Sequence, residues 1–195
     1  MEKKDLDKIP SKEIYKTLSK EEQEAVLALD SMKEFKKGTL LLKEGSYHTQ
    51  SFFVVRGCVR QFQLKNGVDI TSEFYTEDQS VFLDDSDDKP TPSKFSLECI
   101  EDCTLSVVSI DVVKDMYKRF PRFEKMCRVQ TVEELAVFQD KFSRYISSSP
   151  EERYVHLVNT RPDLLDRVPQ YHLASYLGMK PESLSRIRKR LSSKL

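Results

Sequence analysis

The sequence predicts an α+β chain in which an antiparallel β-roll is flanked by helices. Four of the five glycines fall between residues 35 and 110, where each bounds a short apolar or alternating run typical of strands. From about residue 111 the apolar residues return to the spacing of three or four that is typical of helices. The last 28 residues then show two short helical patterns joined at a glycine.

Short helices and strands account for the first part of the chain. Residues 11–34 are predicted to be helical, and many short strands follow at the spacing typical of a sandwich or a barrel-like roll. Asn66-Gly67 is a dipeptide typical of a tight hairpin turn. The strand candidates are residues 40–43, 51–55, 59–64, 68–74, 95–100 and 104–110.

A long helix is predicted from Pro121 to about residue 146, well beyond the roughly 12 residues of an average globular helix. It carries an apolar stripe that would not stand alone in water. We expect this stripe to pair with the same helix of a second copy; packing on the chain's own β core is the alternative. The stripe consists of Phe123, Met126, Val129, Val132, Leu135, Phe138, Phe142 and Tyr145.

The C-terminal segment has the pattern of a helix-turn-helix. Residues 147–150, Ser-Ser-Ser-Pro, are interpreted as a hinge, after which a helix is predicted to begin with Glu151 and Glu152 in its first turn. Gly178 is expected just past the end of a later helix, in the position that favours positive φ, and Pro181 at the start of the next. The apolar contacts of these two helices are Leu173, Leu177, Leu184, Ile187 and Leu191, with small Ala174 allowing close approach.

Charge is distributed unevenly along a chain whose formal net charge is zero. Residues 73–88 contain seven acids and no Lys or Arg, whereas residues 180–195 contain six Lys or Arg and one Glu. A helix-turn-helix with a basic second helix is the arrangement that enters a DNA major groove. We therefore expect nucleic acid to face only the C-terminal end.

Other classes of protein find little support. The sequence contains no apolar stretch of about 18 residues and no signal-peptide core at its N-terminus, so a cytoplasmic protein without a membrane role is expected. It lacks a phosphate-cradling glycine loop, HExxH and GxSxG, which argues against an enzyme. The four cysteines are expected to be buried structural thiols, and Cys99 and Cys103 would meet only if a turn intervenes. Neither these nor the scattered histidines indicate a metal or cofactor.

Two runs carry a resemblance to a known family. The first is Phe52-Phe53-Val54-Val55-Arg56-Gly57-Cys58-Val59-Arg60, and the second is Leu173-Ala174-Ser175-Tyr176-Leu177-Gly178 followed by Glu182-Ser183-Leu184-Ser185-Arg186-Ile187. With the order β-roll, long helix and helix-turn-helix, they resemble the cyclic-AMP receptor protein/fumarate-nitrate regulator (CRP/FNR) family of bacterial transcription factors. The similarity covers nearly the whole chain, and the second run is the more specific.

The resemblance implies three domains. Residues 1–120 would form a cyclic-nucleotide-binding-like β-roll sensor domain with N-terminal helices, and residues 121–147 a long dimerisation helix. Residues 148–195 would form a helix-turn-helix DNA-binding domain that lacks the C-terminal β-hairpin wing usual in the family. The second helix, about residues 181–191, would then carry most of the DNA contact.

The resemblance also implies which side chains read DNA. Glu182 and Arg186 match the positions that read base edges, and they lie four apart, hence on one helix face. Arg can donate to guanine O6 and N7, and Glu can accept from cytosine N4. Pro181 replaces an arginine found in several relatives, so base preference should differ from that of the cyclic-AMP receptor. The other expected DNA-binding residues are Lys180, Ser183 and Ser185, with Arg188, Lys189 and Arg190 at phosphates.

A structural role for the same residues is the alternative. Glu182 and Arg186 could form an intrahelical ion pair, and a basic helix end is favoured by the helix dipole without any DNA.

The effector site that the family resemblance implies is degenerate. Relatives that bind cyclic nucleotides carry a Gly-Glu pair and an Arg-Ser-Ala stretch, but residues 80–95 contain no glycine and no arginine. Asp84, Asp85, Asp87 and Asp88 would repel a phosphate, by a few kcal/mol for one carboxylate at 4–5 Å and an effective ε of about 20. We therefore expect no tight binding of cyclic AMP or cyclic GMP. The degenerate pocket would consist of Phe82, Leu83, Asp84, Ser93 and Lys94.

The function expected from these features is that of a homodimeric transcriptional regulator. It would bind double-stranded DNA at a near-palindromic operator with half-sites about one turn apart. RNA polymerase is a further candidate partner, and the β-roll would sense an unidentified small molecule or none. The alternative is a dimeric scaffold or signalling module that has a degenerate β-roll and does not bind DNA.

Overall fold

The computed structural model describes residues 12–81 and 91–192. The first helices within these ranges are α2 (Lys12–Thr17) and α3 (Lys20–Ala28). Ser19 caps α3 reciprocally with Glu22, each side chain accepting a hydrogen bond from the other residue's backbone N–H. The helical prediction for residues 11–34 was wrong at its end. Asp30, with φ of 42°, turns the chain into a strand, β1 (Met32–Phe35), which pairs with a distant strand.

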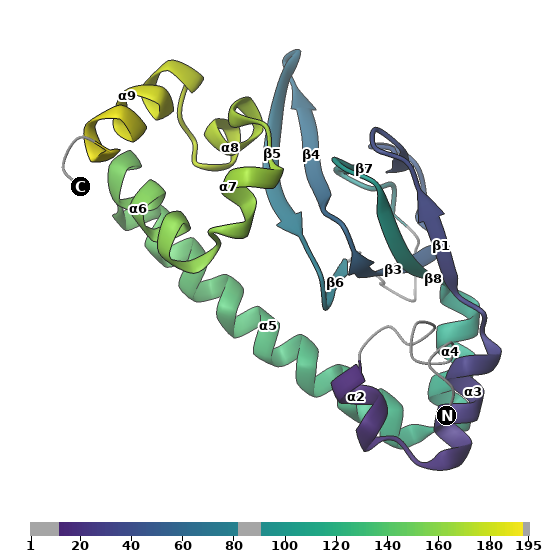
Figure 1. The fold of residues 1–195 in the computed structure, drawn as a ribbon. Coiled ribbons are helices and arrows are strands. Elements are labelled where there is room, and N and C mark those ends of the chain that lie inside the picture. Colours follow the sequence, from purple (N-terminus) through teal and green to yellow (C-terminus); the bar gives the residue numbers. More distant parts are fainter. Residues whose placement is uncertain (1–11, 82–90, 193–195) are drawn as a thin grey trace. The chain divides into compact units, whose positions relative to one another are not determined.

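In the part of the chain that the structure describes, eight strands form two four-stranded sheets (Figure 1). The first sheet has the order β1-β8-β3-β6 and the second β2-β7-β4-β5. Strand β8 pairs antiparallel with both β1 and β3, and β7 pairs antiparallel with both β2 and β4. The remaining strands are β2 (Leu40–Leu42), β3 (Gln50–Arg56), β4 (Val59–Lys65), β5 (Val68–Tyr75), β6 (Gln79–Val81), β7 (Ser96–Cys99) and β8 (Cys103–Ser109).

The core of this part of the chain is built from side chains of both sheets. Val54 and Leu105 come from the first sheet and Val59 and Leu97 from the second, and all four are completely buried. All six predicted strands are confirmed. The two that sequence patterning missed, β1 and β6, are only four and three residues long, too short to display an alternation.

Three of the four cysteines are buried among these strands, as expected, whereas Cys127 is only half-buried. Cys99 ends β7 and Cys103 begins β8, and the turn between them lets the two thiols hydrogen-bond. This hydrogen bond, together with burial, raises the pKa of Cys99 far above its usual range. Gly57, with φ of 107°, lies so close that an added Cβ would be 2.5 Å from Cys103 Sγ. Only glycine fits there.

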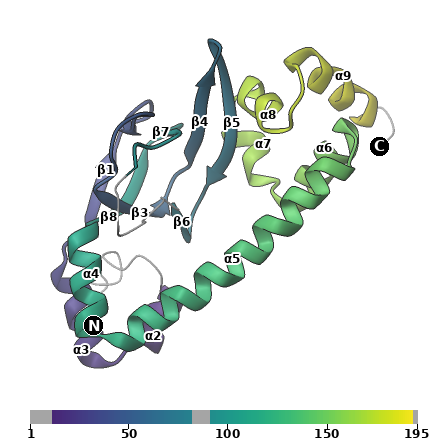
Figure 2. The ribbon, with the colours of Figure 1, turned by 180° about the vertical axis from the view of Figure 1, so that it is seen from behind.

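Helices make up the rest of the described chain. They are α4 (Ile110–Arg119), α5 (Pro121–Ser147), α6 (Pro150–Thr160), α7 (Asp163–Arg167), α8 (Gln170–Tyr176) and α9 (Pro181–Ser192). Figure 2 shows α5 as one uninterrupted helix. The long helix expected from Pro121 is thus confirmed, and residues 148–149, within the expected hinge at 147–150, separate it from α6. None of the helices within the described ranges is long and apolar enough to cross a membrane.

Contacts divide the chain into two compact units. One contains the chain up to Gln63 together with Phe74–Phe123, and the other contains Leu64–Glu73 and the chain from Glu124 onward. The second unit has its own core, in which Leu164, Ala174 and Leu184 are completely buried. Its other buried apolar side chains are Tyr154, Leu157, Val168, Leu173, Leu177 and Ile187.

Candidate nucleic-acid interface

Helices α8 and α9 (labelled in Figure 1) follow one another in the chain, and a tight turn at Gly178 joins them. Leu177 is the last residue with helical backbone angles, and Gly178 follows with φ of 66°. The N–H of Gly178 donates to Ser175 O at 3.0 Å and the N–H of Met179 to Ala174 O at 2.9 Å, which completes a Schellman motif. α9 then begins at Pro181. Both expectations for this turn, glycine with positive φ and proline at the first helical position, are confirmed.

One face of α9 is buried and the opposite face is open. Leu184 and Ile187 point into the core of the unit, with exposed fractions of 0% and 8%. The expected base-reading residues, Glu182 and Arg186, are exposed, and so are Lys180, Ser185 and Lys189; Ser183 and Arg188 are half-buried. Residues 182, 185, 186 and 189 repeat at the helical spacing, so they share the open face. The exposed face therefore offers one carboxylate, one hydroxyl and two cations to a ligand.

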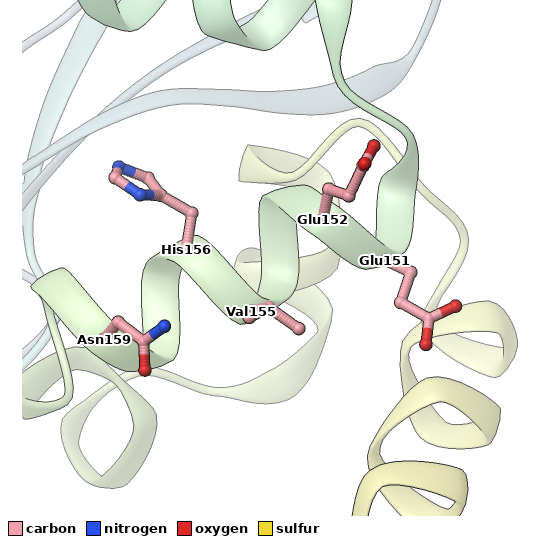
Figure 3. Close-up of a pocket in the computed structure, with 5 residues that line it drawn as sticks. All are labelled: Glu151, Glu152, Val155, His156 and Asn159. Carbon is pink, nitrogen blue, oxygen red and sulfur yellow. The ribbon is translucent and has the colours of Figure 1, made fainter.

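Arg190 is engaged within the protein. Its guanidinium forms an ion pair with Glu151 in the first turn of α6. Figure 3 shows Glu151 extending from α6 toward α9. Sequence patterning missed this pair because the two residues are 39 positions apart. In this structure Arg190 therefore helps to hold α9 against α6.

The tip of the β4–β5 hairpin contacts α8 in the same compact unit. The Ser175 hydroxyl donates to Asp69 O at 3.2 Å and accepts from Thr71 N–H at 2.9 Å, so it pairs with the strand edge as a neighbouring strand would. A second contact joins three side chains: Glu73 forms an ion pair with Lys141 of α5 and accepts a hydrogen bond from Tyr176.

Glu73 raises the pKa of both of its partners in this second contact. Burial opposes the charged form of Lys141, but Glu73 outweighs it and raises the pKa of Lys141. Burial, followed by the same carboxylate, raises the pKa of Tyr176. Lys141 therefore stays a cation and Tyr176 a neutral phenol at neutral pH.

The apolar stripe of α5 is exposed along most of its length. No residue of α5 is buried, and Val132, Leu135, Phe138 and Phe142 each have between 54% and 62% of their surface exposed. The rings of Phe138 and Phe142 stack on each other, with centroids 6.4 Å apart. A contiguous apolar face of this kind on an otherwise charged helix is typical of an interaction surface.

A shallow surface depression of about 450 Å³ lies along α6 (Figure 3). It is lined by Glu151, Glu152, Val155, His156 and Asn159, all from one helix. Both carboxylates already have partners, because Glu151 pairs with Arg190 and Glu152 caps its own helix through Ser149. Hydrogen bonding to Ser149, chiefly from its backbone N–H, lowers the pKa of Glu152. The depression thus offers no set of free polar groups around a ligand.

The described residues contain no cluster of metal ligands and only two of the five residues of the expected effector pocket. Within residues 12–81 and 91–192, no three His, Cys, Asp or Glu side chains are grouped to hold a metal ion. Of the expected effector pocket, Phe82, Leu83 and Asp84 lie outside the described residues. Ser93 uses its hydroxyl locally, donating to Phe95 O at 2.7 Å, while Lys94 is exposed.

Comparison with known proteins bears on the fold. No family model matches the chain, and no curated protein sequence matches it. Solved structures do match. The c-di-GMP-responsive global regulator CLP of Xanthomonas campestris is 17% identical, with a TM-score of 0.69 over 90% of this chain and 93% of that one.

Two further structures agree. FixK2 of Bradyrhizobium japonicum is 17% identical, with a TM-score of 0.68 over 84% of each chain. A CooA mutant from Carboxydothermus hydrogenoformans is 15% identical, with a TM-score of 0.62 over 84% of this chain and 76% of that one. These neighbours are transcription regulators of the CRP/FNR family. The chain described here therefore has the cyclic-nucleotide-binding-like fold of CRP/FNR regulators, as the sequence resemblance implied.

Proposed function

We propose that the chain is a sequence-specific DNA-binding transcriptional regulator of the CRP/FNR type. The observation that carries this proposal is the open face of α9, which presents Glu182, Ser185, Arg186 and Lys189 while Leu184 and Ile187 anchor the helix from behind. An arginine and a glutamate four apart on one exposed face can read a guanine and a cytosine in the major groove. As a DNA-binding protein it would work in the cytoplasm.

In this proposal the protein is a homodimer joined along α5. The exposed stripe supports this, since no residue of α5 is buried within its own chain and Phe138 and Phe142 together present a large apolar surface to solvent. Packing of this stripe against its copy would bury it in a coiled-coil-like seam. Two α9 helices would then address a near-palindromic operator, with half-site centres about one turn apart. RNA polymerase is a candidate partner of the DNA-bound dimer.

The two cations of the open face would have different roles. Arg186 would donate to a base edge, whereas Lys189, one turn further on, would meet phosphate. Arg190 would add to phosphate binding only if it leaves Glu151. The division between base reading and phosphate binding is the part of the proposal that mutations can test.

The test compares variants on a matched operator and on scrambled DNA by fluorescence anisotropy. Arg186→Ala should cost about 1–3 kcal/mol per half-site on the matched operator and little on scrambled DNA. Lys189→Ala should weaken both by the same factor. Lys118→Ala, which removes an exposed cation from α4, is the control and should change neither. Identical behaviour of Arg186→Ala and Lys189→Ala on the two DNAs would contradict the base-reading assignment.

The effector of the β-roll would not be cyclic AMP or cyclic GMP. The support is the composition of residues 80–95, with four aspartates and no arginine. Calorimetry of the full chain with cyclic AMP should show no binding at micromolar concentrations, and a micromolar or tighter constant would contradict this part of the proposal.

A non-DNA-binding scaffold would instead show no DNA binding at any salt concentration.

A further inference from the structure

Arg153, in the first turns of α6, links three helices. Its Nε donates to Leu177 O at 2.9 Å, and its Nη1 donates to Ser148 O at 2.9 Å and to Tyr145 O at 3.1 Å. Its guanidinium also lies over the Tyr145 ring, 4.6 Å from the centroid. One side chain thus contacts the end of α5, the break before α6 and the end of α8.

The three carbonyls belong to chain segments that helix geometry leaves without partners. Tyr145 and Ser148 lie at the C-terminal end of α5, and Leu177 is the C-cap of α8. The last carbonyls of a helix have no intrahelical donor and carry the negative end of the helix dipole. A guanidinium is suited to them because it is always charged and holds several donors in one rigid plane.

The Tyr145 ring completes the junction on the side of the turn. A Cβ added to Gly178 would be 2.0 Å from Tyr145 Oη, so the backbone of the α8–α9 turn lies directly against this ring. The hydroxyl end of the ring therefore meets the turn, while Arg153 lies over the face of the ring. The serines between α5 and α6 are thus held by hydrogen bonds and do not form an unrestrained linker.

We propose that Arg153 is a positioning residue that fixes α8 and α9 relative to α5, and so sets the distance between the two recognition helices of a dimer. The inference rests on the proposed function, because it assumes that α5 forms the seam and α9 reads DNA. Arg153 acts through carbonyls of its own chain and does not contact DNA.

A positioning role predicts that loss of Arg153 affects binding to two half-sites more than binding to one. Affinity for a single half-site would depend mainly on α9. The gain from the second half-site depends on how well its recognition helix is already placed, since a flexible link lowers the effective concentration of the second contact. Loss of Arg153 should therefore reduce that gain and broaden the preferred half-site spacing.

The experiment measures wild type, Arg153→Ala, Arg153→Lys and the control Arg144→Ala on an isolated half-site, on the full operator and on operators with altered spacing. Arg144 joins α5 to α6 through His156 but, among the described residues, forms no hydrogen bond with Leu177. For Arg153→Ala, full-operator affinity should fall by about tenfold or more while half-site affinity changes by less than about twofold. Arg153→Lys should be intermediate, because one ammonium cannot reach three carbonyls in the same geometry.

Equal losses on the half-site and the full operator would overturn the proposal and reduce Arg153 to a fold-stabilising residue. So would the same spacing change in Arg144→Ala. Hydrogen exchange of the free protein supplies a readout without DNA: Arg153→Ala should speed exchange at residues 147–149 and 177–179, and unchanged exchange would also overturn the proposal. If wild type binds no DNA, the proposed function fails. The exchange measurement still decides whether Arg153 holds α5, α6 and α8 together.

Discussion

Replacing Gly178 by alanine should lower the free energy of unfolding by about 1.5–3 kcal/mol, from two separable causes. Gly178 has φ of 66°, and an L-residue held in the left-handed region costs about 1–2 kcal/mol. The new Cβ would also lie 2.0 Å from Tyr145 Oη, so the phenol must swing away. Swinging away removes its stacking on Arg153, worth about 0.5–1 kcal/mol at a partly exposed site.

A double-mutant cycle with Tyr145→Phe separates the two causes. Without the hydroxyl, the nearest remaining ring atom is Cζ at 3.1 Å, which a small shift relieves. Gly178→Ala should then cost only the backbone strain, so the coupling energy should be about 0.5–1 kcal/mol. Gly67→Ala is the matched control. Gly67 has a similar φ of 77° but no atom within 4 Å of an added Cβ, so its cost should not depend on Tyr145.

The assay is urea unfolding followed by circular dichroism, at one fixed protomer concentration because the proposed dimerisation would add to apparent stability. A loss below about 0.5 kcal/mol for Gly178→Ala would refute the strain argument, since the left-handed conformation alone should cost more. A coupling energy of zero with Tyr145→Phe would refute the proposed packing of the turn against the ring. The Gly67→Ala result calibrates the backbone contribution in the same protein.

Three further substitutions test the anchoring of α9, the role of Arg190 and the proposed seam along α5. Leu184→Ala, at a completely buried position of α9, should cost about 2–5 kcal/mol in urea unfolding, and a loss under 1 kcal/mol would mean that α9 is not anchored. Glu151→Gln should free Arg190 and remove a nearby acid, so DNA affinity should rise by a similar factor on matched and scrambled sites; an unchanged affinity would show that Arg190 does not reach phosphate. Phe138→Glu should place a charge in the proposed seam and yield monomers in sedimentation velocity, and an intact dimer would exclude α5 as the interface.

Local sequence signals predicted the elements whose chemistry is local. Asn66-Gly67 gave the β4–β5 hairpin, and Gly178 with Pro181 gave the end of α8 and the start of α9, because positive φ and a missing N–H constrain the backbone wherever they occur. The spacing of Leu184 and Ile187 likewise predicted which face of α9 is buried. Sequence patterning missed the strand at Met32–Phe35, because this strand forms by pairing with β8, which begins about 70 residues later.

The contacts that organise the candidate site are long-range and polar, and no spacing rule finds them. In the sequence, Arg153 stands in an ordinary first helical turn. Its contact with Leu177 O, 24 residues away, exists only in the folded chain. Glu73 belonged to an acidic stretch whose partners, Lys141 and Tyr176, lie 68 and 103 residues further on. Arg190 was assigned to phosphate with the other cations of α9, and only the packing of α6 revealed its ion pair with Glu151. Such pairs depend on tertiary structure, which charge composition does not encode.

The open face of α9 is proposed to read DNA in a dimer. In vitro selection of binding sites from random duplexes by the full chain tests it most directly. We expect an enriched inverted repeat with half-site centres about 10–10.5 base pairs apart, and binding that weakens steeply between about 50 and 200 mM salt. Failure to enrich any sequence, together with no binding at 50 mM salt, would contradict it.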